Sequence, residues 1–181
     1  MVYKSVFVSK SMITAHLSGE RIASSGEEAF SLYDKSRFGE KKKGKIEYSL
    51  AEALFLVSEG KMSVLFGKKE ISEDTLLKRA RKIDKKIETK LAVFSDVRKR
   101  GYIVKTALKF GAEFRVYDKG VKPGEDHAKW ILYAARENDA LTWHDFAAKN
   151  RVAHSTKKNL LIGVVDEEGD VSYYQVEWIR P

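Results

Sequence analysis

Hydrophobic and polar positions in the first half of the chain alternate between the period of strands and the spacing of amphipathic helices. Strands are predicted at residues 3–8, 11–17 and 61–67, and helices at residues 26–39 and 48–60. The second helix has the clearest start signal, because Ser49 stands three residues before Glu52 in the spacing of a capping box. Gly60 then offers a helix C-terminus. The lysine-rich residues 40–45 between the two helices are interpreted as a solvated loop.

A long helical segment, residues 72–101, changes character in its middle. Residues 78–90 carry seven Lys or Arg and few large apolar side chains, and an apolar stripe resumes at residue 92. A basic run of this kind forms either a solvated helix face or linker, or a contact with RNA. We place a domain boundary within residues 80–88, which divides the chain into domains at residues 1–83 and 84–181.

The second half of the chain has a different pattern, with five strands and one helix. Strands are predicted at residues 101–108, 112–118, 127–135, 158–166 and 171–179. A helix over residues 142–155 is inserted before the fourth strand, and Thr142 is its expected cap. The sequence "EEGD" between the last two strands is typical of a hairpin turn. The predicted fold is α/β (α+β), with a small N-terminal mixed α/β domain followed by a C-terminal domain whose central mixed β-sheet is flanked by helices.

Composition narrows the class of protein. The 181 residues are 43% hydrophobic, and the net charge is +8, which favours a polyanionic partner such as nucleic acid. The absence of cysteine excludes disulfides and cysteine-ligated zinc. No stretch approaches the roughly 18 apolar residues of a membrane span, and the first residues lack the apolar region of a signal peptide. We therefore expect a cytoplasmic protein with no membrane association.

Common catalytic motifs are missing from the sequence. There is no phosphate-binding loop, no dinucleotide fingerprint and no H-E-x-x-H pair, and the four histidines lack the spacing of metal ligands. We therefore expect neither a metal nor a cofactor. Metal-free acid–base chemistry and simple binding remain as alternatives.

One loop and one lysine pair carry candidate chemistry. Tyr117 ends a predicted strand, and His127 begins the next strand after a glycine-containing loop that can fold back. Histidine is a common general acid or base, and tyrosine can serve as a base when nearby cations such as Lys129 favour its deprotonation. Lys157 and Lys158 stand at the entry to the fourth strand, where either could reach the same mouth or cap the preceding helix. From these residues alone, packing and catalysis both remain open.

Three segments of the chain together resemble the catalytic subunit of archaeal tRNA-splicing endonucleases. They are residues 91–120, His127 and residues 151–178, and they carry the patterns R-G-[YF]-x-V-K-T, K-F-G-x-x-F-x-V-Y, a histidine ten residues on, and H-S-x-x-K-x-L. The sequences "LYDKSRFG" and "LAEALFLVSEG" resemble the front domain of that family. One departure is Ala107, where relatives often have glycine.

The resemblance implies a role for each of three residues. Tyr117 would act as general base, His127 as general acid and Lys158 as stabiliser of the transition state. Lys158 matches the pattern in preference to Lys157, because Ser155 stands three residues before it and leucine two residues after it. The substrate would be precursor tRNA at a bulge–helix–bulge, cleaved without metal to 2′,3′-cyclic phosphate and 5′-hydroxyl ends.

The resemblance also implies contacts beyond the reaction centre. Arg151, and less directly Arg180, would clamp a flipped bulge base. The acidic turn between the last two strands would dock onto another subunit, through Asp166, Glu167, Glu168 and Asp170. The last strand would pair with its symmetry mate. The assembly would be a homotetramer, or a heterotetramer with a structural subunit.

Two other functions remain as alternatives. A non-catalytic, RNA-binding or structural subunit of the same assembly would be expected to lack one or more of Tyr117, His127 and Lys158. A basic DNA-binding module would need a recognition helix rich in base-reading side chains, and the helix at residues 142–155 has few.

Overall fold

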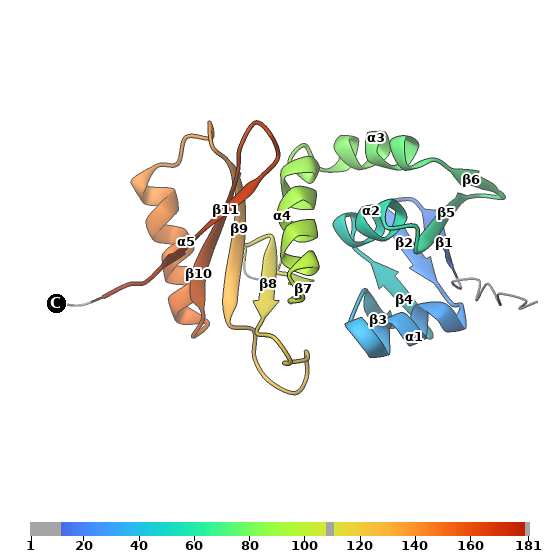
Figure 1. The fold of residues 1–181 in the computed structure, drawn as a ribbon, viewed down its shortest axis with the longest axis horizontal. Coiled ribbons are helices and arrows are strands. Elements are labelled where there is room, and N and C mark those ends of the chain that lie inside the picture. Colours follow the sequence, from blue (N-terminus) through green and yellow to red (C-terminus); the bar gives the residue numbers. More distant parts are fainter. Residues whose placement is uncertain (1–11, 108–110, 180–181) are drawn as a thin grey trace, which may run out of the picture.

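The computed structural model of the chain describes residues 12–107 and 111–179. Its N-terminal part has a six-stranded sheet of order β3-β4-β2-β1-β5-β6, in which only the β1–β5 pair is parallel (Figure 1). The elements are β1 (Ile13–Ser18), β2 (Arg21–Ser24), α1 (Glu27–Ser36), β3 (Glu40–Lys42), β4 (Lys45–Tyr48), α2 (Leu50–Ser58), β5 (Met62–Phe66) and β6 (Lys69–Ile71). The strand predicted at residues 3–8 lies outside the described residues.

The capping box predicted for the second helix is confirmed. The Glu52 N–H donates to Ser49 Oγ at 3.3 Å, and the Ser49 N–H donates to Glu52 Oε2 at 3.0 Å. Residues 41–45 are exposed as predicted, but the prediction of a loop throughout residues 40–45 is wrong, because β3 and β4 form a hairpin whose turn is Lys43 and Gly44. The side chains of Ile46 and Tyr48, on one face of β4, are buried in the core. β4 also pairs with β2, and β3 joins the sheet through its pairing with β4.

The basic helical segment divides into α3 (Glu73–Ile83) and α4 (Ile87–Lys99). Asp84 ends α3 in an extended conformation, and its carboxylate accepts hydrogen bonds from the Lys86 N–H at 2.9 Å and from Lys90 Nζ at 2.7 Å. These contacts start α4 in a new direction. We propose the domain boundary at this break, between the two sheets.

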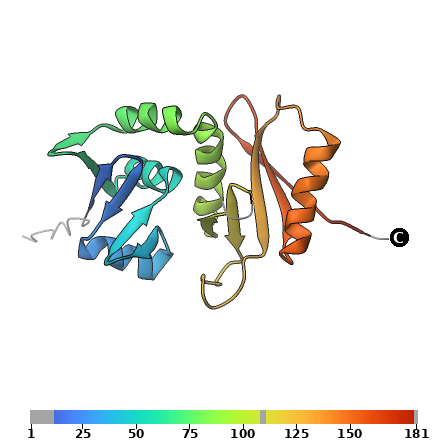
Figure 2. The ribbon, with the colours of Figure 1, turned by 180° about the vertical axis from the view of Figure 1, so that it is seen from behind.

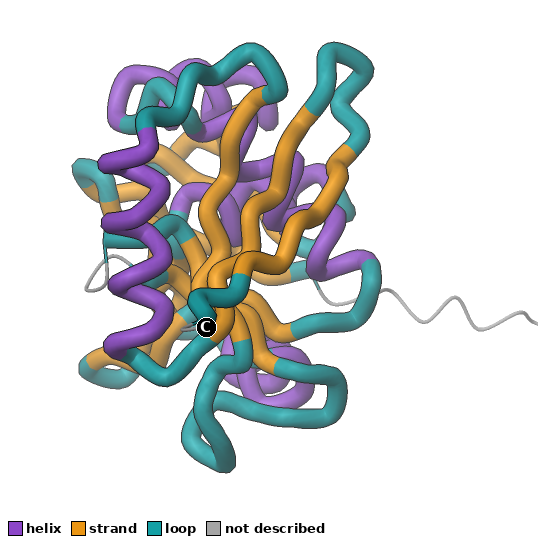
Figure 3. The backbone as a smooth tube through the Cα atoms, turned by 90° about the vertical axis from the view of Figure 1, so that its left-hand side faces the viewer, coloured by secondary structure: helices purple, strands orange, loops and turns teal. Residues whose placement is uncertain are grey.

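The C-terminal part has a five-stranded sheet of order β11-β10-β9-β8-β7, mixed because β9 and β10 run parallel and the other pairs antiparallel. Its elements are β7 (Ile103–Thr106), β8 (Phe114–Tyr117), β9 (Trp130–Arg136), α5 (Trp143–Ser155), β10 (Asn159–Val165) and β11 (Val171–Val176). Figure 3 shows α5 lying along this sheet, and α4 packs on its other face. The predicted fold class and the five strands are confirmed.

One hydrophobic core connects the two sheets through α4. Phe94 of α4 lies with its ring centroid 6.4 Å from that of Phe38 and 5.7 Å from that of Phe55, both from the N-terminal part. On its other side it lies 5.6 Å from Phe114 of β8. Because this cluster is continuous, we expect the two halves of the chain to stabilise each other and to unfold together.

Candidate active site

Tyr117, His127 and Lys158 lie together at one end of the C-terminal sheet. Tyr117 is the last residue of β8, His127 lies in the loop before β9, and Lys158 directly precedes β10. Because β8 runs antiparallel to β9 and β9 runs parallel to β10, these three chain positions meet at the same edge. All three side chains line one pocket of about 400 Å³.

Tyr117 forms a buried wall of this pocket. Its side chain is only 4% exposed, and burial raises the pKa of its hydroxyl above the ordinary value, against the opposing effect of the Arg115 guanidinium. The expected lowering by nearby cations is therefore not the net effect. Lys129, one of those cations, is engaged in an ion pair with Asp118 at 2.8 Å. A base in this position is held mostly protonated until substrate or a rise in pH removes its proton.

His127 lies at the mouth of the pocket, where its side chain is exposed. The loop that carries it is shaped by backbone hydrogen bonds, from the Val121 N–H to the Asp118 carbonyl at 3.1 Å and from the Glu125 N–H to the Lys122 carbonyl at 3.0 Å. An imidazole at the mouth and a phenol at the wall provide two proton-transfer groups at different depths.

The two adjacent lysines have different backbone roles. The Lys157 N–H donates to the His154 carbonyl at 3.0 Å, and the Lys158 N–H donates to the Ala153 carbonyl at 2.9 Å, which is the Schellman pattern of a helix end. Lys157 takes the left-handed position of this motif (φ 54°) and is exposed. Lys158 is half-buried, lines the pocket, and donates from Nζ to the Thr156 carbonyl at 2.7 Å. Its ammonium therefore also caps the helix end, as the structural interpretation of the sequence allowed.

Replacing Lys157 by glycine is expected to stabilise the protein. Glycine adopts the left-handed conformation without the steric clash of a Cβ atom, so Lys157→Gly should raise the free energy of unfolding by about 1 kcal/mol. Chemical denaturation of the variant and the wild type measures this difference. A variant less stable than the wild type would contradict the Schellman assignment.

The remaining predicted site residues lie away from the pocket or outside the described chain. Arg151 is exposed on α5, and Arg180 is outside the described residues. The acidic turn between β10 and β11 is closed by the Asp170 N–H, which donates to Asp166 Oδ1 at 2.8 Å, and its Glu167 and Glu168 side chains are exposed. This turn and the loop that carries the histidine lie at opposite ends of the sheet (Figure 1 and Figure 2).

Arg115 is a pocket residue that the sequence interpretation did not single out. It occupies a variable position of the K-F-G-x-x-F-x-V-Y pattern, so the pattern gives it no role. The available signal was the two-residue period of a strand, which turns Arg115 to the same face as Tyr117.

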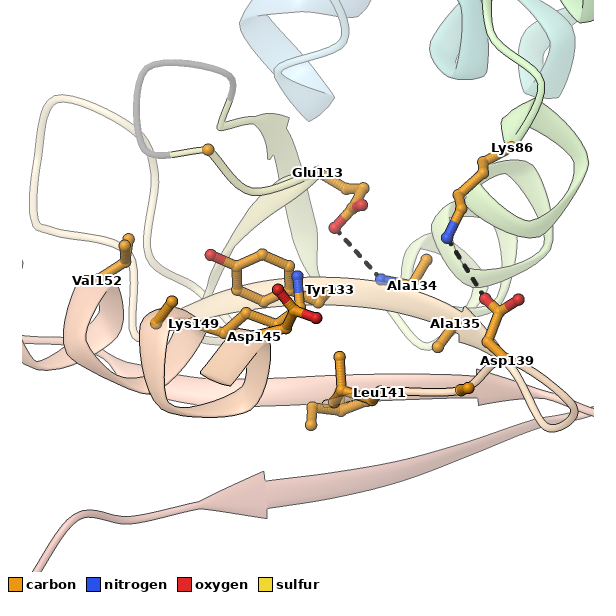
Figure 4. Close-up of a pocket in the computed structure, with 14 residues that line it drawn as sticks. Lys86, Glu113, Tyr133, Ala134, Ala135, Asp139, Leu141, Asp145, Lys149 and Val152 are labelled. Carbon is orange, nitrogen blue, oxygen red and sulfur yellow. Dashed lines mark hydrogen bonds and ion pairs between the residues drawn. The ribbon is translucent and has the colours of Figure 1, made fainter. Parts of the chain in front are cut away.

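A second pocket of about 460 Å³ lies between α5 and the sheet (Figure 4). Its charged groups have partners within the chain: Lys86 is 3.4 Å from Asp139, and Glu113 accepts a hydrogen bond from the backbone of β9 at 3.4 Å. Lys149 Nζ lies 4.0 Å from the ring centroid of Tyr133. Because these charged groups already have contacts within the chain, this pocket has the weaker claim to be a reaction centre.

The part of the chain that the structure describes has neither a bilayer-spanning helix nor a cluster of metal ligands. None of its helices combines the length and apolar character that crossing a bilayer requires. Within the same residues, no three His, Asp or Glu side chains are grouped as a metal site would need.

Comparisons with known proteins agree on one family. Residues 13–77 match the tRNA intron endonuclease N-terminal domain, and residues 87–173 match the tRNA intron endonuclease catalytic C-terminal domain. The tRNA-splicing endonuclease of Thermococcus gammatolerans is 42% identical over 170 residues, which cover 93% of this chain and 99% of the relative. The protein of the same name from Pyrococcus horikoshii is 42% identical over 172 residues, covering 94% and 99%. That of Methanothermobacter thermautotrophicus is 38% identical over 150 residues, covering 83% and 87%.

Proposed function

This chain belongs to the tRNA intron endonuclease family, and we propose that it is a catalytic member that excises introns from precursor tRNA. The proposed cleavage sites are the intron–exon junctions of a bulge–helix–bulge. The observation that carries the proposal is the convergence of Tyr117, His127 and Lys158 on one pocket of about 400 Å³. A non-catalytic subunit would have no need to keep all three groups together.

The proposed reaction is an in-line transesterification without metal. Tyr117, once ionised to the phenolate, accepts the proton of the ribose 2′-hydroxyl, and the 2′-oxygen forms a bond to phosphorus as the bond from phosphorus to the 5′-oxygen breaks. His127 donates a proton to that 5′-oxygen, and the ammonium of Lys158 stabilises the negative charge that develops on the phosphorane. The products carry a 2′,3′-cyclic phosphate and a 5′-hydroxyl.

The decisive experiment is incubation of the purified chain with a bulge–helix–bulge RNA in EDTA, followed by analysis of the product ends. Cleavage at both junctions with cyclic phosphate and 5′-hydroxyl ends is the expected result. An RNA with 2′-deoxyribose at each junction is the matched control and should stay intact, because it lacks the nucleophile. Intact RNA in the first reaction would contradict the enzymatic function, and 5′-phosphate products would contradict the mechanism.

For substrate contacts, we propose that Arg151 stacks its guanidinium on an unpaired base of the bulge, with Arg180 as a second contact. A guanidinium plane stacks well on an unpaired base. Arg151 is exposed, as such a contact requires.

For assembly, we propose a tetramer, formed by this chain alone or with a structural subunit. Strand β11 is at the sheet edge, and its Tyr174 is 59% exposed, which suits pairing with a symmetry mate. The acidic turn would dock into a groove of about 410 Å³ between the two halves of another subunit. The charged residues that line this groove are mostly basic: they are Lys35, Lys61, Arg98, Lys99 and Lys122, with Glu59 as the acidic member.

Charge reversal tests this docking. Glu167→Lys with Glu168→Lys should reduce the native mass from tetramer to dimer, because like charges would then face each other across the interface. Lys61→Glu with Lys99→Glu on the groove side should restore the tetramer when added to the same chain. A tetramer that persists after the first pair of changes would contradict the docking.

A further inference from the structure

Arg115 lies beside Tyr117 in the pocket, on the same face of β8. Backbone pairing sets it opposite Ile131 of β9, whose side chain is fully buried. The Nε atom of Arg115 is buried and has no hydrogen-bond partner among the described residues. The pocket is therefore lined by a guanidinium whose inner N–H group lacks an acceptor.

An N–H group buried without an acceptor is unfavourable, more so when it is charged, so such groups are rare and need an explanation. Packing alone does not require a cation here, because an apolar side chain would fill the same space beside Ile131 without that penalty. A ligand with anionic oxygens supplies the missing acceptors. Guanidinium is the side-chain group that matches the paired oxygens of a phosphate, through parallel N–H donors.

The position of Arg115 also matters for the base. Its guanidinium favours the phenolate form of Tyr117 and so opposes part of the rise in pKa that burial causes. Lys158 lines the same pocket from the start of β10, so the two cations reach it from different strands. A phosphate between them would have a cation on each side, and the phenol would face its ribose.

We propose that Arg115 is a further catalytic residue, which binds the non-bridging oxygens of the scissile phosphate and stabilises the phenolate of Tyr117. This inference rests on the proposed function, since it concerns the same pocket. Arg115 exchanges no proton in the reaction. It binds the phosphorane through charge-assisted hydrogen bonds that strengthen as negative charge accumulates on the non-bridging oxygens.

Single-turnover cleavage with saturating enzyme tests the inference in the full chain. Arg115→Gln should lower the rate by about 10²-fold, the scale of losing one stabilising donor. Its affinity for the 2′-deoxy RNA should stay within about threefold of the wild type, because the interaction is strongest in the transition state. Arg115→Lys keeps the charge but loses the paired donors, so it should recover part of the rate. Lys119→Gln, a nearby cation that does not line the pocket, is the matched control.

The pH profile separates catalysis from a structural effect. Without the guanidinium the phenolate of Tyr117 is less favoured. The cleavage rate of Arg115→Gln should therefore continue to rise up to a higher pH than the rate of the wild type or of the Lys119 control does. Two outcomes would overturn the inference: Arg115→Gln cleaving within about threefold of the wild type at all pH values, or losing RNA affinity in proportion to rate. If Arg115→Gln does not fold, Arg115→Lys replaces it, and a wild-type rate and profile in that variant overturn the inference. A wild-type chain that leaves the RNA intact overturns the proposed function itself.

Discussion

Replacing Lys158 by alanine is expected to lower the single-turnover rate of RNA cleavage by about 10²- to 10³-fold. The reason is the position of its ammonium, which lines the pocket together with Tyr117 and His127 and is oriented by the Thr156 carbonyl. A preorganised cation stabilises the phosphorane more than the ground-state phosphate, so the loss should fall on the rate more than on RNA affinity. Quenched-flow or manual time courses with enzyme in excess measure it.

The neighbouring lysine provides the matched control for this prediction. Lys157 has the same charge one residue away, but it occupies the exposed left-handed position at the end of α5. Lys157→Ala should therefore change the rate by less than about threefold. Equal losses from the two variants would contradict the register that assigns the catalytic role to Lys158.

Local signals were sufficient to predict much of the C-terminal sheet. Its strands have regular apolar patterns, and α5 is capped by Thr142, whose hydroxyl accepts a hydrogen bond from the Asp145 N–H at 3.1 Å as the sequence predicted. The hairpin of β3 and β4 was missed because the lysines of residues 40–45 resemble a loop. Its pairing depends on β2, a contact that the local pattern of these residues does not report.

The candidate site was predictable only in part. Strand ends and the family resemblance pointed to Tyr117, His127 and Lys158, and the pairing of β8, β9 and β10 explains why they meet. The resemblance gave no role to Arg115, because it occupies a variable position of the pattern. The missing information was physical: the burial of its Nε atom, which emerges only when the sheet packs.

Sequence patterns also could not predict a buried ion pair that connects the two halves of the chain. Lys105 of β7 is 5% exposed, and its Nζ atom lies 3.5 Å from Glu52 Oε1, 53 residues away in sequence. The same ammonium donates to the carbonyls of Arg37 and Gly39. The lysine of the R-G-[YF]-x-V-K-T pattern thus contacts the N-terminal part, outside the candidate pocket.

Replacing Lys105 by methionine is expected to lower the free energy of unfolding by about 3–5 kcal/mol. The change removes one partner of the pair and leaves the Glu52 carboxylate buried at 4% exposure without its counter-ion. Because the core around Phe94 joins both sheets, this loss should appear as a lower midpoint in one cooperative transition. Chemical denaturation followed by circular dichroism measures it.

The burial of Lys105 also predicts the direction in which the stability of the protein changes with pH. Burial lowers the pKa of Lys105 in the folded chain, and the neighbouring Glu52 opposes that shift only in part. The unfolded chain therefore holds this proton more tightly, so the stability contributed by Lys105 should rise with pH between its folded pKa and its ordinary value. The difference in pH dependence between the wild type and the Lys105→Met variant measures this slope, together with the change in the titration of the neighbouring Glu52 and Arg98.

The double variant decides whether the loss comes from the unpaired charge. Adding Glu52→Gln to Lys105→Met removes the buried carboxylate charge. The amide oxygen can still accept from the Gly39 N–H, as Glu52 Oε1 does at 2.9 Å, but the bond from the Ser49 N–H to Oε2 is lost. The double variant should therefore be more stable than Lys105→Met alone by about 1–3 kcal/mol. A double variant less stable than Lys105→Met would contradict this, because it would mean that the Glu52 carboxylate stabilises the fold through its own hydrogen bonds to Gly39 and Ser49 by more than its unpaired charge costs.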